Sequence, residues 1–174
     1  MLPTAEAEKQ RYQFHHNSIE DKGYLSFLEK SIQPMLPYLK EEMHGLDYGC
    51  GPEPVLAQLL HQKYRLDCES YDPYFFPNKP AKKYDFIFST ETFEHFFQPG
   101  EEIWNLHSLL HSNSFLCVMT NLYHSLSGFE QWWYRRDITH VCFYHAETFH
   151  YIADHFGFNL LYQDQEQVMI LQKT

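Results

Sequence analysis

Apolar residues follow two alternating spacings along the chain, and this alternation predicts an α/β fold. Between the strand-like runs, apolar residues recur at three- and four-residue steps, which is typical of helices. Strands that alternate with helices form a doubly wound, mostly parallel, Rossmann-like sheet with helices on both faces. The last two runs are joined by about four residues, so we expect an antiparallel hairpin at the end of the sheet. The apolar runs typical of strands cover residues 66–71, 85–89, 115–120, 159–163 and 168–172.

A helical stripe precedes the first predicted strand. It begins at Tyr24, and Pro34 and Pro37 kink or end the helix. We therefore expect residues 1–44 to form an N-terminal helical cap on a core of residues 45–174. At 174 residues the chain has the length of one domain.

A glycine-bearing turn follows the first short apolar run and precedes a helix that opens at a proline. Gly49 and Gly51 lie in this turn, where the absence of a Cβ lets backbone N–H groups approach a ligand. Asp72 lies 21 positions beyond Gly51, at the end of the 66–71 strand. A carboxylate at that spacing can accept hydrogen bonds from ribose hydroxyls. The turn and the carboxylate together predict a cofactor that contains a nucleoside.

Four segments in this order resemble the class I S-adenosylmethionine-dependent methyltransferases. They are residues 46–51, Asp72, residues 84–91 with Glu94 and His95, and residues 115–121. The resemblance covers most of residues 45–172 and implies the class I methyltransferase fold, S-adenosyl-L-methionine as cofactor and a methyl acceptor. A NAD-type fingerprint fits less well, because it requires glycine at Pro54. By the same resemblance, the cofactor-binding residues are Asp47, Gly49, Cys50, Gly51, Glu53, Asp72, Pro73, Thr90 and Glu91.

Two departures from the family pattern concern the cofactor. Glu53 stands where the family usually has glycine, and it could pair with the ammonium or sulfonium, point into solvent, or narrow the methionine pocket. Residues 73–83 are too few for the helix and strand that usually follow, so we expect the third strand of the fold to be absent. The 66–71 strand then becomes an edge strand, and its Asp67 and Glu69 suit that position. Three aromatic residues could stack on the adenine or simply fill the core: Tyr74, Phe75 and Phe76.

The acceptor side is expected in residues 121–145, because ligands bind beyond the carboxyl ends of parallel strands. Some bacterial family members look similar at residues 137–141, which read Asp-Ile-Thr-His-Val. In one interpretation His140 is a base or an orienting group, and Arg135 or Arg136 binds an anionic group of the acceptor. The other makes Asp137, Thr139 and His140 a hydrogen-bonded brace. The candidate substrate-binding residues are Asn121, Trp133, Arg135 and Arg136.

His95 is the second catalytic candidate, because by the resemblance it follows the strand 85–89 on the acceptor side of the cofactor. The alternative is that His95 makes a cap or a buried hydrogen bond. Near the N-terminus, His15, His16 and Asn17 could close over the cofactor or belong to a frayed end. No metal site is expected, since His107 and His111 share a helix face without an acidic or cysteine partner at ligand spacing.

Composition limits the partners. The net charge of −10 argues against a nucleic acid, whose binding depends on basic patches. The chain begins without a secretory signal pattern and no apolar run approaches membrane length, so we expect a soluble, cytoplasmic protein. The favoured function is methyl transfer to a small-molecule acceptor. The alternative is a non-catalytic S-adenosylmethionine-binding module or partner subunit, and the oligomeric state stays open.

Overall fold

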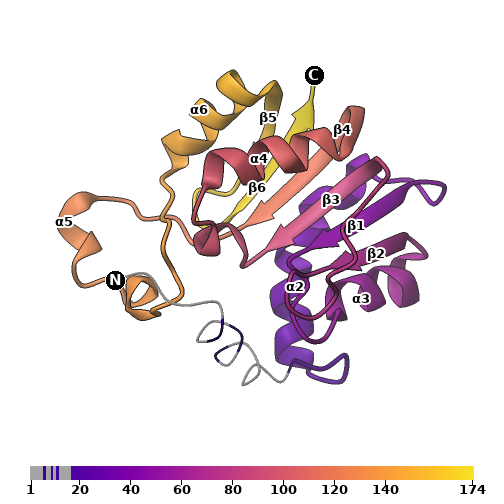
Figure 1. Ribbon diagram of the computed structural model, residues 1–174, viewed down its shortest axis with the longest axis horizontal. Helices are drawn as coiled ribbons and strands as arrows, with labels where there is room; N and C mark the ends of the chain where they lie inside the picture. Colours follow the sequence, from indigo (N-terminus) through magenta and orange to yellow (C-terminus); the bar gives the residue numbers. More distant parts are fainter. Residues whose placement is uncertain (1–5, 7–8, 10, 12–16) are drawn as a thin grey trace.

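The computed structural model describes residues 6, 9, 11 and 17–174 (Figure 1). His15 and His16, for which a position over the cofactor was one of two interpretations, lie outside the described residues. Among the described residues, no helix has both the length and the apolar character needed to cross a membrane.

The centre of the described structure is a six-stranded sheet with the strand order β2-β1-β3-β4-β6-β5. Strands β1 to β4 run parallel, while β6 is antiparallel to both β4 and β5. This confirms a mostly parallel sheet that ends in an antiparallel hairpin. The strands are β1 (His44–Tyr48), β2 (Asp67–Tyr71), β3 (Tyr84–Thr90), β4 (Leu110–Met119), β5 (Phe158–Gln163) and β6 (Val168–Lys173).

Helices cover both faces of the sheet (Figure 1). Helices α2 (Lys22–Met35) and α3 (Val55–Tyr64) pack on one face with Phe86 and Phe88 of β3, whereas α4 (Pro99–Ser108) and α6 (Ala146–Phe156) pack on the other with Ile87. The alternation follows from the strand, in which successive side chains point to opposite faces. The short helices are η1 (Leu36–Tyr38), η2 (Phe93–His95), α5 (Leu126–Phe129) and η3 (Trp133–Arg136).

The predicted loss of a strand between residues 73 and 83 is confirmed. In this described segment, pairing is limited to one isolated bridge between Asp72 and Phe76, and β2 is an edge strand. Phe75 and Phe76 are half-buried. At the end of the segment Lys82 forms an ion pair with Glu69 at 2.7 Å, and the Tyr84 hydroxyl donates to Glu69 at 2.7 Å. These contacts hold the returning chain against β2.

The predicted bounds of β4 were wrong at its start. The sequence predicted a strand from residue 115, whereas β4 begins at Leu110, directly after α4. The cause is a register shift against β3, where Tyr84 pairs with Leu110 and Phe86 pairs with Phe115. The residues between the two pairs include exposed polar side chains, so the first part of the strand has no apolar pattern.

Candidate functional site

A cavity of about 750 Å³ opens at the carboxyl ends of β1, β2 and β3. This is the end at which ligands bind in open parallel sheets. Its walls come from the glycine turn, the chain after β2, the chain after β3, helix α4, helix α2 with the residue Asn17 before it, and the loop 137–140. The cavity therefore brings together segments that are far apart in the sequence.

The glycine turn needs glycine at two positions for different reasons. Gly49 and Gly51 have φ angles of 87° and 69°, a left-handed conformation that other residues rarely adopt. A Cβ at Gly49 would lie 2.3 Å from the Thr92 hydroxyl oxygen, whereas one at Gly51 would meet no atom within 4 Å. Gly51 also lines the cavity, so its missing side chain leaves room for a ligand beside the backbone.

Asp72 connects the turn to the chain that follows β2. Its Oδ2 accepts a hydrogen bond from the Gly51 N–H at 3.1 Å, and its Oδ1 accepts from the N–H groups of Tyr74 and Phe75 at 2.8 and 3.1 Å. A carboxylate has about four acceptor positions. Three backbone bonds thus leave Asp72, which lines the cavity, able to accept one more donor.

Two carboxyl groups lie deep in the cavity, after β3. The Tyr134 hydroxyl donates to Glu91 Oε2 at 3.2 Å, and the Thr120 hydroxyl donates to Glu94 Oε2 at 2.8 Å. Burial, reinforced by the nearby Glu94, raises the pKa of Glu91 to about 8, and burial also raises the pKa of Glu94. Glu94 is fully buried, and its Oε1 has no hydrogen-bond partner.

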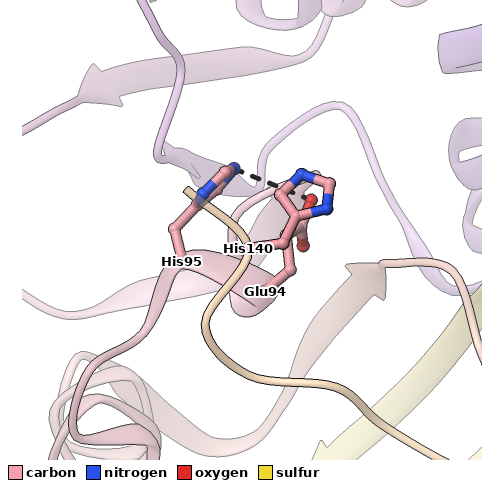
Figure 2. A group of neighbouring side chains, drawn as sticks. All are labelled: Glu94, His95 and His140. Atoms are coloured by element: carbon pink, nitrogen blue, oxygen red, sulfur yellow. Dashed lines mark ion pairs between the residues drawn. The ribbon is translucent and has the colours of Figure 1, made fainter. Parts of the chain in front are cut away.

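His95 and His140 meet Glu94 at this end of the cavity (Figure 2). The Nδ1 of His95 donates to the carbonyl oxygen of Thr139 at 2.9 Å, and the Nδ1 of His140 donates to the carbonyl oxygen of Tyr134 at 2.7 Å. The His95 Nε2 lies 3.8 Å from Glu94 Oε1. Burial lowers the pKa of His140, which favours the neutral imidazole.

The loop that carries His140 is braced from both ends. Asp137 Oδ1 accepts hydrogen bonds from the N–H and the hydroxyl of Thr139 at 3.0 and 2.7 Å, and the Glu94 carbonyl accepts the N–H groups of Val141 and Cys142 at 2.8 and 3.0 Å. Burial opposes ionisation of Asp137, but bonds from Thr139 and from Arg11 at 3.0 Å hold its pKa below its ordinary value. The predicted brace is confirmed for Asp137 and Thr139.

Most of the predicted cofactor residues line the cavity, but two do not. Asp47 is buried inside β1, where burial and then the Asp72 carboxyl raise its pKa to about 7. Glu53 is exposed and lies outside the cavity lining, so of its three predicted orientations the structure adopts the one toward solvent. The predicted residues that do line the cavity are Gly49, Cys50, Gly51, Asp72, Pro73, Thr90, Glu91, His95 and His140.

The four predicted substrate residues lie outside the cavity lining. In η3 the side chain of Tyr134 points inward and is buried, so its neighbours Trp133 and Arg135 face solvent. Arg136 is also exposed, and Arg135 donates to the Glu130 carbonyl at 2.8 Å. Asn121 lies behind Glu91, with its amide 3.5 Å from Glu91 Oε1.

The sequence reasoning missed one wall of the cavity and its charge. Tyr24 and Phe27 of α2 line it, and neither was among the predicted site residues. Its described lining contains six acidic side chains and neither lysine nor arginine. Burial holds Glu91 and Glu94 toward the neutral form, and the other carboxyl groups of the lining favour a ligand with positive charge. The acidic residues are Asp72, Glu91, Glu94, Glu101, Glu102 and Asp137.

The strand order and the cavity at the carboxyl ends are those of the class I methyltransferase fold. A family model described as a methyltransferase domain matches residues 19–163, and the chain belongs to that family. No curated protein matches the chain by sequence. The enzyme is therefore a methyltransferase with S-adenosylmethionine as its cofactor.

Solved structures share the fold at low sequence identity. A SAM-dependent methyltransferase from Archaeoglobus fulgidus is similar with a TM-score of 0.62 at 16% identity, over 95% of this chain and 98% of that one. Magnesium protoporphyrin IX methyltransferase from Synechocystis, solved with bound SAH, has a TM-score of 0.57 at 12% identity, over 96% and 94%. Mitomycin 7-O-methyltransferase has a TM-score of 0.64 at 11% identity, over 84% of this chain and 54% of that one.

The residues of the cavity fit this cofactor. Gly51 leaves open space beside its backbone, and Asp72 keeps acceptor capacity for a ribose hydroxyl. Thr90, at the end of β3, also lines the cavity, and its hydroxyl oxygen is buried without a hydrogen-bond partner. The acidic lining suits a cofactor that carries a sulfonium and an ammonium.

Proposed function

We propose that the chain transfers a methyl group from S-adenosylmethionine to a neutral or positively charged small-molecule acceptor. The observation that carries the proposal is the single acidic cavity that joins the glycine turn and Asp72 to His95 and His140. Both reactants can therefore meet in one enclosed space. When bound, the sulfonium supplies an electrophilic methyl group, and alignment with exclusion of water is the main task left to the protein.

The cofactor end of the cavity consists of the glycine turn, Asp72 and Pro73. Here the backbone of Gly51 and the carboxylate of Asp72 would bind the nucleoside. Tyr74, two residues after Asp72, lies in the cavity wall, and its ring would stack on the adenine. The sheet has no further strand on this side. Thr90 and Glu91, at the end of β3, would bind the methionine portion.

The acceptor end is formed by His95 and His140. The Nδ1 atoms of both rings donate to backbone carbonyls, so neither imidazole can rotate without losing a hydrogen bond. Fixed rings at the end of a cavity can orient the nucleophilic atom of an acceptor at little entropic cost. We assign them this orienting role.

Size and charge support a small acceptor. A volume of about 750 Å³ is within the range of pockets for small ligands, roughly 300–1,000 Å³. The acidic lining opposes a polyanion such as nucleic acid. Two proteins of the same fold are named for small molecules, mitomycin and magnesium protoporphyrin IX.

The second candidate function is a cofactor-binding module without transfer activity, which the shortened adenine side favours. Calorimetric titration with S-adenosylmethionine, S-adenosylhomocysteine and NAD tests the binding step. We expect the first two to bind and NAD not to bind. Methyl transfer from labelled S-adenosylmethionine to a panel of small amines and phenols then separates the candidates, because the module would bind the cofactor and label nothing.

A further inference from the structure

Glu94, His95 and His140 present three potential metal ligands at one point of the cavity (Figure 2). One ligand atom from each residue lies within 4.8 Å of the other two. Ligands at about 2.1 Å from a tetrahedral ion are about 3.4 Å from each other. Small side-chain movements of about 1 Å would therefore bring all three onto one ion.

The hydrogen bonds of the two imidazoles prepare them for this role. Each Nδ1 donates to a backbone carbonyl, that of Thr139 for His95 and that of Tyr134 for His140. This fixes the tautomer in which Nε2 carries the lone pair. Metal-binding histidines almost always donate their other nitrogen in this way, which orients the ring and raises its basicity.

The third ligand, Glu94, is a buried carboxyl group with an incomplete set of partners. It is 0% exposed, Thr120 donates to one oxygen, and the other oxygen has no hydrogen-bond partner. Leaving such an atom unpaired costs free energy, and a buried carboxyl is usually paired or binds a metal. The unpaired oxygen is the one that lies 3.8 Å from the His95 Nε2.

We propose that Glu94, His95 and His140 bind a divalent first-row transition-metal ion such as Zn²⁺, Co²⁺ or Mn²⁺. Two neutral imidazoles and one carboxylate are ligands that suit these ions better than Mg²⁺ or Ca²⁺, which prefer oxygen. Three protein ligands leave at least one coordination position for another group. Local spacing in the sequence predicts no metal site, because His140 lies 45 positions after His95.

The open position would face the cavity, since all three ligand residues line it. An oxygen of the acceptor could take that position and be held beside the methyl donor. This extension rests on the proposed function, while the metal site itself does not. The orienting role of the two histidines would then be exerted through the ion.

The experiment titrates the chelator-treated full chain with CoCl2 and follows the visible absorption of bound Co²⁺, with ZnCl2 as competitor. We expect one ion per chain, displacement by Zn²⁺, and no displacement by equimolar Mg²⁺. His140→Ala and Glu94→Gln should each weaken Co²⁺ binding by roughly 100-fold or more. His111→Ala is the matched control and should leave the affinity unchanged. His111 is exposed at the start of β4, whereas the cavity opens at the carboxyl ends of the parallel strands.

S-adenosylhomocysteine binding to the metal-free chain and to each variant reports whether the fold and the cofactor site are intact. Failure to bind Co²⁺ or Zn²⁺ at one ion per chain would overturn the metal site. So would undiminished binding in both His140→Ala and Glu94→Gln, and equal competition by Mg²⁺ would refute the transition-metal assignment. Metal binding without any binding of the nucleoside would instead contradict the proposed function alone.

Discussion

The ring of His95 and the carbonyl of Thr139 are joined by a 2.9 Å hydrogen bond that connects two loops 44 positions apart in the sequence. The same two loops are also connected by the Glu94 carbonyl, which accepts the N–H groups of Val141 and Cys142. The acceptor end of the cavity thus depends on the chain after β3 for the position of His140. We expect a substitution in either loop to change the position or the mobility of the other.

Replacing His95 by alanine should loosen the loop 137–142. The Thr139 carbonyl would lose its donor, and an unsatisfied buried group costs about 1–3 kcal/mol. Hydrogen exchange of the Val141 and Cys142 amides in the metal-free chain measures this, and we expect faster exchange there than in wild type. His145→Ala, at the start of α6, serves as a histidine control and should leave those amides unchanged.

Replacing Asp72 by alanine should weaken S-adenosylhomocysteine binding by roughly 10- to 150-fold, because charge-assisted hydrogen bonds to a ribose are lost. Glu53→Gln is the matched control. Since Glu53 is exposed and outside the cavity, we expect affinities for both S-adenosylmethionine and S-adenosylhomocysteine to stay at the wild-type values. Calorimetry on both variants checks the pair, and wild-type affinity in a folded Asp72→Ala protein would remove the ribose assignment.

Replacing Gly49 by alanine should destabilise the fold by at least about 2 kcal/mol. The left-handed φ of 87° alone costs a non-glycine residue about 1–2 kcal/mol, and the new Cβ would overlap Thr92. Gly100→Ala is the comparison, because its Cβ would meet no atom within 4 Å and its helical position favours alanine. Urea unfolding measures the free energy of unfolding of both variants. An unchanged value for Gly49→Ala would contradict the described turn.

Replacing Asp47 by asparagine should stabilise the chain at pH 8 but not at pH 4. The folded-state pKa of about 7 lies above the ordinary value of 3.8, so the folded state holds the proton more tightly. The free energy of unfolding therefore falls as pH rises from about 4 to 7. At higher pH the ionised Asp47 lowers it by up to roughly 4 kcal/mol. Urea unfolding across this pH range should show a flatter profile for Asp47→Asn. An unchanged profile would mean that Asp47 ionises normally in the folded chain.

Local patterns in the sequence were enough to predict the order of the elements, the edge position of β2, and the glycine turn that lies beside Asp72. The positions of the glycine turn and of Asp72 depend on short stretches of sequence. Turn residues fix the first, and the end of a strand fixes the second. The brace between Asp137 and Thr139 is likewise a short-range hydrogen bond that an Asp-x-Thr sequence favours.

The orientation of the side chains in residues 133–136 could not be predicted in the same way. Arg135 and Trp133 face solvent because Tyr134 takes the single inward position of η3, and a four-residue turn has no periodicity to reveal this. The meeting of Glu94 with His140 depends on a long loop that folds back onto the chain after β3. Tyr24 and Phe27 looked like ordinary core residues, since a cavity wall and a packed core use the same helical spacing.

Because β2 is an edge strand, the cavity does not depend on any further strand of the sheet on that side. The cavity opens at β1, β2 and β3, and its other walls come from helices and loops rather than from a strand beyond β2. Under the proposed function, we therefore expect that residues inserted into the 73–83 connection would contact the adenine and leave His95 and His140 in place. For protein engineering, this predicts that nucleoside selectivity can be changed at residues 73–83 independently of the methyl-transfer step.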